Sequence, residues 1–157
     1  GLTAAAFDDD RGVFNLCLAR AFALEGDAAR VKVHAEAARK AFEEQLRATP
    51  DDPERLALLG LALAHLGRKE DAVRAGERGA ALVPVSKDAY AGALLQHQLV
   101  KLYLVLGENE KALDRLEPLL AIPSVLSPGW LRIDPTFDPL RGNPRFEKIS
   151  APVRISP

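Results

Sequence analysis

The residues of this chain with the most chemical potential are three histidines, one cysteine and a run of three aspartates. No two of the histidines His34, His65 and His97 have the His-x-x-x-His spacing that brings two imidazoles to one metal ion on a helix. The chain also contains no HExxH, GxSxG, Walker A or GxGxxG string. We therefore expect no catalytic residues, no metal site and no bound cofactor.

The cysteine and the aspartates have simpler interpretations. Cys17 is the single cysteine, so it cannot form an internal disulfide or a cysteine-rich zinc site. It stands between Leu16 and Leu18 in an apolar stretch, where we expect it to be buried and inert. The run 8–10 lacks the spacing and closing glutamate of a calcium loop, and it favours an acidic helix start instead.

Composition excludes several classes of protein. The 157 residues are 48% hydrophobic and carry a net charge of −1, which argues against a dedicated nucleic-acid binder. No run of 18 apolar residues exists, so we expect no membrane insertion, and no signal peptide is recognisable. Alanine and leucine dominate, while β-branched alternation is missing, so the chain is predicted to be all-α.

The ends of the chain suggest an origin. It begins Gly-Leu and contains no methionine, which suggests a fragment cut from a longer protein. The compartment is therefore unknown from the sequence: the cytoplasm is slightly favoured, and the parent could be membrane-anchored.

The stretch 53–86 organises the rest of the chain. Four leucines recur there at helical spacing: Leu56, Leu59, Leu63 and Leu66. Gly67 breaks this pattern, a second helical pattern follows, and Pro84 ends it. Two short helices joined by a tight turn cannot bury their apolar faces alone, so the unit needs neighbours.

This stretch resembles a tetratricopeptide repeat (TPR), a helix pair of about 34 residues. The matching positions, counted from Pro53, are Leu56, Leu59, Gly60, Leu63, Ala72 and Pro84. Gly76 departs from the pattern, because the family usually has a large aromatic residue there. We expect another side chain, from a lengthened neighbouring helix, to occupy that space.

Two further helix pairs flank this repeat. Before it we expect helices at 13–25 and about 28–48, the second being seven residues, or two turns, longer than the TPR pattern. After it we expect a helix at 88–106, about two turns longer at its start than the helix at 53–66, and a partner helix at 110–122.

The tail is rich in proline, and three prolines follow a residue that caps helices: Asp134-Pro135, Asp138-Pro139 and Asn143-Pro144. That pattern predicts short helices started one after another. We expect them to close the open end of the array by packing their apolar residues on it: Trp130, Leu131, Ile133, Phe137, Leu140, Phe146 and Ile149.

The string WLRIDPTFDPLRGNPRFEKI, residues 130–149, resembles the end of TPR regions in large bacterial signalling proteins. In those proteins the region commonly follows a Ser/Thr kinase, cyclase or DNA-binding domain, with or without a TolB-like segment. The resemblance implies a TPR-like right-handed α-solenoid of three helix pairs over residues 1–126. The pairs are about 13–50, 53–86 and 88–126, and a capping segment of short helices and tail covers 127–157.

In TPR arrays the first helix of each pair lines a concave groove that binds ligands. The corresponding positions here are Leu16, Arg20, Ala23, Glu54, Ala57, Leu61, Ala64, His65, Leu94, His97, Lys101 and Leu104. We take Arg20, Leu61, His65, His97 and Lys101 as the candidate partner-binding residues. The Lys, Asn and Arg set of the family's carboxylate clamp is absent. Packing roles remain open for the histidines, Leu61 and Leu104, because the tail could fold into the groove.

The function predicted from this resemblance is a non-catalytic scaffold that binds a protein or peptide segment. One alternative is self-association, in which a homodimer regulates an effector domain of the parent. A second is an accessory region that positions the catalytic domain of an enzyme.

Overall fold

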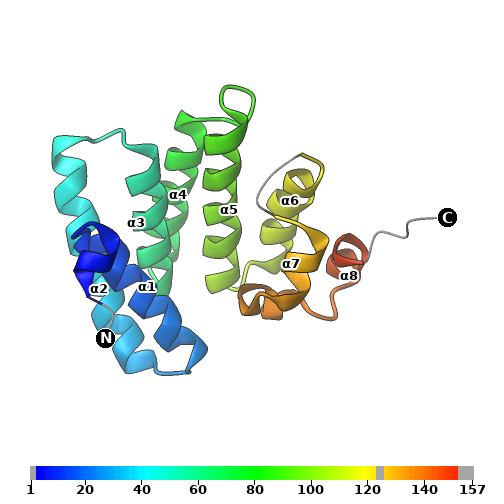
Figure 1. Ribbon diagram of the computed structural model, residues 1–157, viewed down its shortest axis with the longest axis horizontal. Coiled ribbons are helices and arrows are strands. Elements are labelled where there is room, and N and C mark those ends of the chain that lie inside the picture. Colours follow the sequence, from blue (N-terminus) through cyan, green and yellow to red (C-terminus); the bar gives the residue numbers. More distant parts are fainter. Residues whose placement is uncertain (1–2, 123–125, 152–157) are drawn as a thin grey trace.

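The computed structural model describes residues 3–122 and 126–151, and every regular element in that part is a helix (Figure 1). The long helices are α1 Arg11–Leu24, α2 Ala28–Ala48, α3 Pro53–His65, α4 Lys69–Leu82, α5 Ala89–Val105 and α6 Asn109–Leu120. The short ones are η1 Ala4–Phe7, α7 Pro128–Ile133, η2 Pro135–Leu140 and α8 Pro144–Ser150, η denoting a 3₁₀ helix. The prediction of an all-α chain is confirmed for these residues. The tail residues Pro123, Pro152 and Pro157 lie outside them.

Aspartates start four of the long helices. The side chains of Asp10, Asp27, Asp52 and Asp88 each accept a hydrogen bond from a backbone N–H in the first turn of α1, α2, α3 and α5. These bonds satisfy amides that have no partner inside the helix. Asp10, the last residue of the aspartate run, is thus a helix cap, in agreement with the acidic helix start predicted for that run.

The three tight turns within the helix pairs have the same geometry. Gly26, Gly67 and Gly107 have φ angles of 76°, 73° and 72°, a conformation that glycine adopts without strain. The residue after each glycine donates a backbone hydrogen bond to the carbonyl five positions earlier, at 2.9, 3.0 and 2.8 Å. This is the Schellman ending of a helix, and it returns the chain alongside the helix it has left.

Glycines allow α3 and α4 to approach closely. A Cβ on Gly60 would lie 2.8 Å from the backbone nitrogen of Gly76, and a Cβ on Gly79 would lie 2.6 Å from the carbonyl oxygen of Pro53. The two helices therefore meet backbone to backbone at these points.

Side chains of α5 occupy the space beside Gly76, as expected. Leu102 Cδ1 and Leu99 Cδ2 lie 2.7 and 3.0 Å from the position of a Cβ there. The predicted elongation of α5 was too large: the helix has 17 residues against 13 in α3, a difference of four, or about one turn. Both leucines also lie beyond that added turn, so the extension itself does not fill the gap.

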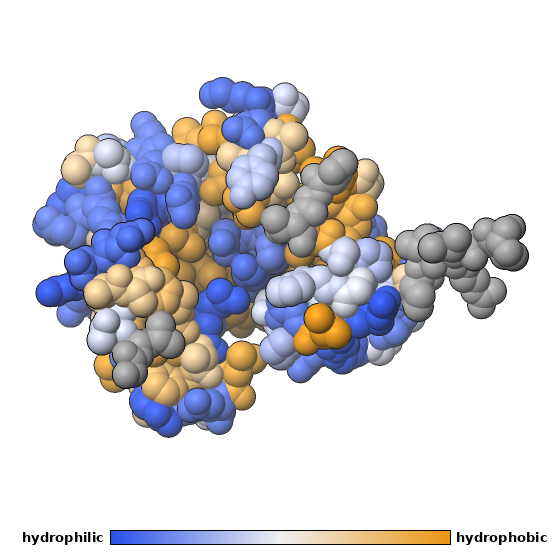
Figure 2. Space-filling model, in the orientation of Figure 1, coloured by the Kyte–Doolittle hydropathy of each residue, from blue (hydrophilic) through white to orange (hydrophobic). Residues whose placement is uncertain are grey.

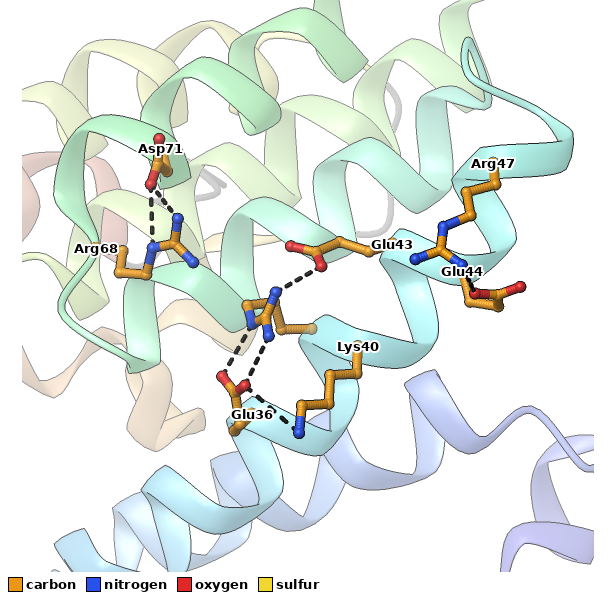
Figure 3. A network of polar contacts seen from close by, with 8 residues as sticks. Glu36, Lys40, Glu43, Glu44, Arg47, Arg68 and Asp71 are labelled. Atoms are coloured by element: carbon orange, nitrogen blue, oxygen red, sulfur yellow. Dashed lines mark hydrogen bonds and ion pairs between the residues drawn. The ribbon is translucent and has the colours of Figure 1, made fainter.

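Helix α2 has the predicted extra length, 21 residues against 14 in α4. Charged side chains pair along its surface, as Figure 3 shows around Glu36 and Glu43. Arg39 Nε donates to Glu36 at 2.9 Å and its Nη1 donates to Glu43 at 2.5 Å. Arg39 is thus neutralised by carboxylates one helical turn before and after it.

Helix α3 lies at the centre of the molecule. It packs against α1, α2, α4 and α5, and eight of its 13 residues are buried. Figure 1 shows α1, α3 and α5 following one another from the N-terminal end toward α7 and α8. The first helices of the three pairs therefore form a continuous row.

The short helices of the tail partly match the prediction. Asp134-Pro135 and Asn143-Pro144 start η2 and α8, while Ser127-Pro128, which was not predicted, starts α7 in the same way. Asp138-Pro139 starts no helix, because Pro139 lies inside η2, where its fixed φ fits the 3₁₀ conformation.

The apolar residues of the tail divide into two groups. Leu131, Phe137, Leu140 and Phe146 are buried, and Ile149 packs partly buried against the core. Trp130 and Ile133 are 48% and 73% exposed, so the expectation that they pack on the last helix pair is wrong. The helix α7 has only six residues and turns that side away from the core.

One arginine joins α8 to α6. Arg145 forms ion pairs with Glu110, Asp114 and Glu117 at 2.7, 2.9 and 3.0 Å. The three carboxylates hold the pKa of Arg145 above its usual range, so its charge is permanent.

Candidate interaction groove

Two cavities lie along the same sides of α3 and α5. The first, which we call the basic cavity, has a volume of about 440 Å³ and is bounded by α1, α3, α5 and η2. The second, the apolar cavity, has a volume of about 710 Å³ and lies at the opposite ends of α3 and α5. Residues 91, 94 and 98 of α5 line the apolar cavity and residues 101 and 105 line the basic one. These positions recur every three or four residues, so they share one face of the helix.

The basic cavity brings together four of the five candidate residues: Arg20, Leu61, His65 and Lys101. Figure 2 shows the surface hollowed between the lobe of α1 and α2 and the lobe of α7, η2 and α8, with hydrophilic residues inside the hollow. Of the other TPR-derived positions, Ala23 and Leu104 also line this cavity, while Glu54 and Leu94 line the apolar cavity.

His97 does not line either cavity. Its side chain is 9% exposed and stacks on Phe137 of η2, with ring centroids 6.4 Å apart and planes 5° apart. Because the tail covers His97, this histidine is a packing residue and not part of the open groove. Leu16, at 3% exposure, is likewise a core residue.

Sequence reasoning missed two parts of the wall of the basic cavity, one on α1 and one on η2. Cys17 was expected to be buried, but it is half-buried and lines the cavity with Arg20 and Leu24. The spacing of three and four residues between these positions was the available signal. Pro135, Thr136 and Pro139 of η2 complete the wall, and no local pattern indicates that the tail returns to this place.

The two cations of the cavity differ from the other half-buried cations of the described residues. In the described residues, six arginines and lysines are half-buried, and four of them form ion pairs: Arg39, Arg55, Arg115 and Arg145. Arg20 and Lys101 are the two that, within residues 3–122 and 126–151, have neither an ion pair nor a hydrogen bond.

Burial and mutual repulsion alter the pKa values in and beside the cavity. Burial, reinforced by the charge of Arg20, lowers the pKa of Lys101 to about 8. Burial also lowers the pKa of His65 to about 4, again with Arg20 as the second cause. The pKa of His97 is about 4 as well, through burial and the charge of Lys101. At pH 7 the cavity therefore holds two cations and a neutral imidazole.

Asp134 is the carboxylate whose charge acts on both Lys101 and His97, raising the pKa of each against the effect of burial. Burial acts to raise its pKa, but hydrogen bonds from Thr136 and Trp130 hold the pKa below its usual value. The Thr136 amide donates to Oδ1 at 2.8 Å and Trp130 Nε1 donates to Oδ2 at 3.0 Å. Both oxygens of Asp134 are thus engaged in starting η2 and holding α7.

The cavity contains a thiol and an imidazole. Cys17 and His65 line one cavity, but no hydrogen bond joins them among the described contacts, as a thiol and its general base would require. Over residues 3–122 and 126–151 no cluster of histidine, cysteine and carboxylate side chains could hold a metal ion. Across the same residues, no helix has the length and apolar character needed to cross a membrane.

Comparison with protein-family models, with curated proteins and with solved structures finds no match for this chain. Its function is therefore argued from the groove itself.

Proposed function

We propose that the chain is a non-catalytic interaction module that binds a protein or peptide segment in the groove along α1, α3 and α5. The observation that carries this proposal is the alignment of the two cavities on one face of α3 and α5. Together they offer an apolar floor with isolated polar groups, which is typical of surfaces that recognise extended or helical segments.

The architecture that we propose for this module is a TPR-like right-handed solenoid of three helix pairs, with the short helices of the tail as its cap. Three features support it: the repeated glycine turns, the close approach at Gly60 and Gly76, and the row formed by α1, α3 and α5. In such an array the first helices of the pairs line the concave side.

A peptide library displayed on phage tests this proposal and requires no candidate partner. Random linear peptides are selected on the wild-type protein, and the enriched ones are measured against two variants. Ala23→Trp places a bulky ring at the exposed edge of the basic cavity, while Ala81→Trp places the same ring on an exposed position of α4 that lines neither cavity.

We expect the selected peptides to lose binding to Ala23→Trp and to keep it with Ala81→Trp, circular dichroism showing that both variants are folded. Equal binding to the two variants, or no enrichment at all, would show that the groove is not the binding surface.

Self-association is a second candidate, and α7 favours it. Trp130 and Ile133 are one helical turn apart and both exposed, so they form an apolar face at the end of the array. Light scattering over a concentration series should then show a dimer that Ile133→Glu abolishes. A monomer at high micromolar concentration would exclude this candidate for the chain.

A further inference from the structure

We propose that the basic cavity is an acidic-residue subsite, in which Arg20 and Lys101 bind the carboxylate of an aspartate or glutamate side chain of the bound segment. This inference rests on the proposed function, because it assumes a segment in the groove. It names what the groove selects in that segment.

The basic cavity contains two cations that have no ion pair among the described residues. Arg20 and Lys101 line one cavity with the apolar side chains of Leu61 and Leu104, and both cations are half-buried. A cation partly removed from water and left without a counter-ion is unfavourable. The other half-buried cations of the described chain avoid this by pairing with carboxylates, for example Arg55 with Asp10 at 2.9 Å. A carboxylate from outside would do the same for Arg20 and Lys101.

The protein does not supply that carboxylate itself. Asp134 is close enough to influence Lys101, but its two oxygens accept hydrogen bonds from Thr136 and Trp130. Those bonds hold the carboxylate at the start of η2, and Asp134 forms no ion pair with Lys101 among the described residues. The cavity therefore retains an excess of positive charge in a chain whose net charge is −1.

The opposite end of the groove has the opposite character. Pro53, Val83 and Leu94 give the apolar cavity its floor, while Asp51, Asp52 and Glu54 stand around it. Asp51 already pairs with Arg78 at 2.5 Å, but Asp52 and Glu54 have no ion pair among the described residues. These two carboxylates repel an acidic residue and favour an apolar one flanked by neutral or basic residues. The groove is thus positive at one end and negative at the other. The bound segment therefore lies with its acidic residue at the basic cavity.

The distance between the two ends sets the spacing in the segment. Leu94 and Lys101 are seven residues apart on α5, which is about 10 Å along the helix axis. An extended peptide covers that distance in about three residues. The preferred segment therefore carries an aspartate or glutamate about three positions from an apolar residue.

The selection experiment, extended by one variant and its control, tests this inference. Random peptides are selected on the wild type and, separately, on the double variant Arg20→Gln/Lys101→Gln. The matched control is Lys32→Gln/Lys148→Gln, which removes two exposed, unpaired lysines that line neither cavity and so makes the same change in net charge. We expect acidic residues at a fixed position to be enriched by the wild type and the control, and not by the groove variant.

One enriched peptide is then compared with its Asp→Asn or Glu→Gln counterpart by isothermal titration calorimetry on the wild-type protein. The amide peptide should bind about tenfold more weakly, and the groove variant should not distinguish the two peptides. The wild-type comparison needs no protein variant to fold.

The possible outcomes separate the two proposals. Enriched peptides that are blocked by Ala23→Trp but contain no preferred acidic residue would overturn the acidic subsite and leave the groove as the binding site. Absence of any groove-dependent peptide would overturn the proposed function and the subsite with it. A preference for phosphorylated over carboxylate peptides in the same calorimetry would also overturn the inference as stated.

Discussion

The buried histidines predict a specific loss of stability in mild acid. The pKa values of His65 and His97 are about 4 in the folded chain against an ordinary value of 6.5. Between these two values the unfolded chain binds protons that the folded chain does not. The free energy of unfolding must therefore fall as the pH falls through this window.

The size of the effect follows from the two pKa values. At pH 5, a histidine with a pKa of 4 when folded and 6.5 when unfolded lowers the free energy of unfolding by about 2 kcal/mol. At pH 7.5 the same group contributes almost nothing. Two such histidines would remove about 4 kcal/mol, a large part of the 5–15 kcal/mol that stabilises a typical domain.

Charged groups around His97 reinforce the direction of the change. Lys101 on the same helix opposes its protonation most strongly after burial, Asp134 before η2 favours protonation to a smaller extent, and Arg20 on α1 opposes it more weakly still. Carboxylates whose pKa values lie below the ordinary range, such as Glu36 and Asp134, lose their contribution to the free energy of unfolding only at lower pH. The comparison is therefore made between pH 7.5 and pH 5.

Urea unfolding followed by circular dichroism measures this difference, with His97→Gln as the informative variant. The variant should lose about half of the pH-dependent change, whatever its stability at pH 7.5, and His65→Gln/His97→Gln should lose nearly all of it. An unfolding free energy of the wild type that is the same at both pH values would refute the reasoning. So would an NMR titration that shows the His97 ring protonating near pH 6.5 in the folded protein.

Three further predictions concern packing, charge and access. Gly60→Ala should lower the free energy of unfolding by about 2 kcal/mol, and by more than Gly76→Ala does. The added methyl group at position 60 meets backbone atoms, whereas at position 76 it meets the ends of leucine side chains. Equal losses in urea unfolding would contradict this. Lys101→Met should raise the free energy of unfolding at pH 7 by about 1 kcal/mol, because it removes a half-buried charge without a partner; a lower thermal midpoint would show that the charge is already compensated. Cys17 lines the basic cavity, so a saturating groove peptide should slow its reaction with a thiol reagent, and an unchanged rate would place the peptide elsewhere.

Local signals predicted most of the helices well. The second helix was expected at Ala28–Ala48 and has those bounds, because an aspartate cap and a continuous amphipathic pattern lie within the segment itself. Gly67 and Gly107 mark the ends of α3 and α5 for the same reason: a left-handed residue is a property of a few adjacent positions.

The candidate site was predicted less completely. The resemblance to TPR arrays predicted Arg20, Leu61, His65 and Lys101 as groove residues on the first helices of the pairs, and the structure brings these four to one cavity. The same resemblance placed His97 with them, but Phe137, forty residues further along the chain, stacks on its ring. Whether a side chain is open or covered depends on segments that no local pattern connects.

The sequence alone determined the helices, their caps and their glycine turns, because each depends on hydrogen bonds and backbone preferences within a few residues. The tertiary structure decided which charges are left without partners. Some ion pairs join elements far apart in the chain, as those of Arg145 in α8 with three carboxylates of α6 do. Arg20 and Lys101 stand without an ion pair among the described residues because folding places α1, α3, α5 and η2 around them and brings no carboxylate into the lining of their cavity. Desolvation and Coulomb interaction depend on that three-dimensional arrangement, and so does the chemistry of the groove.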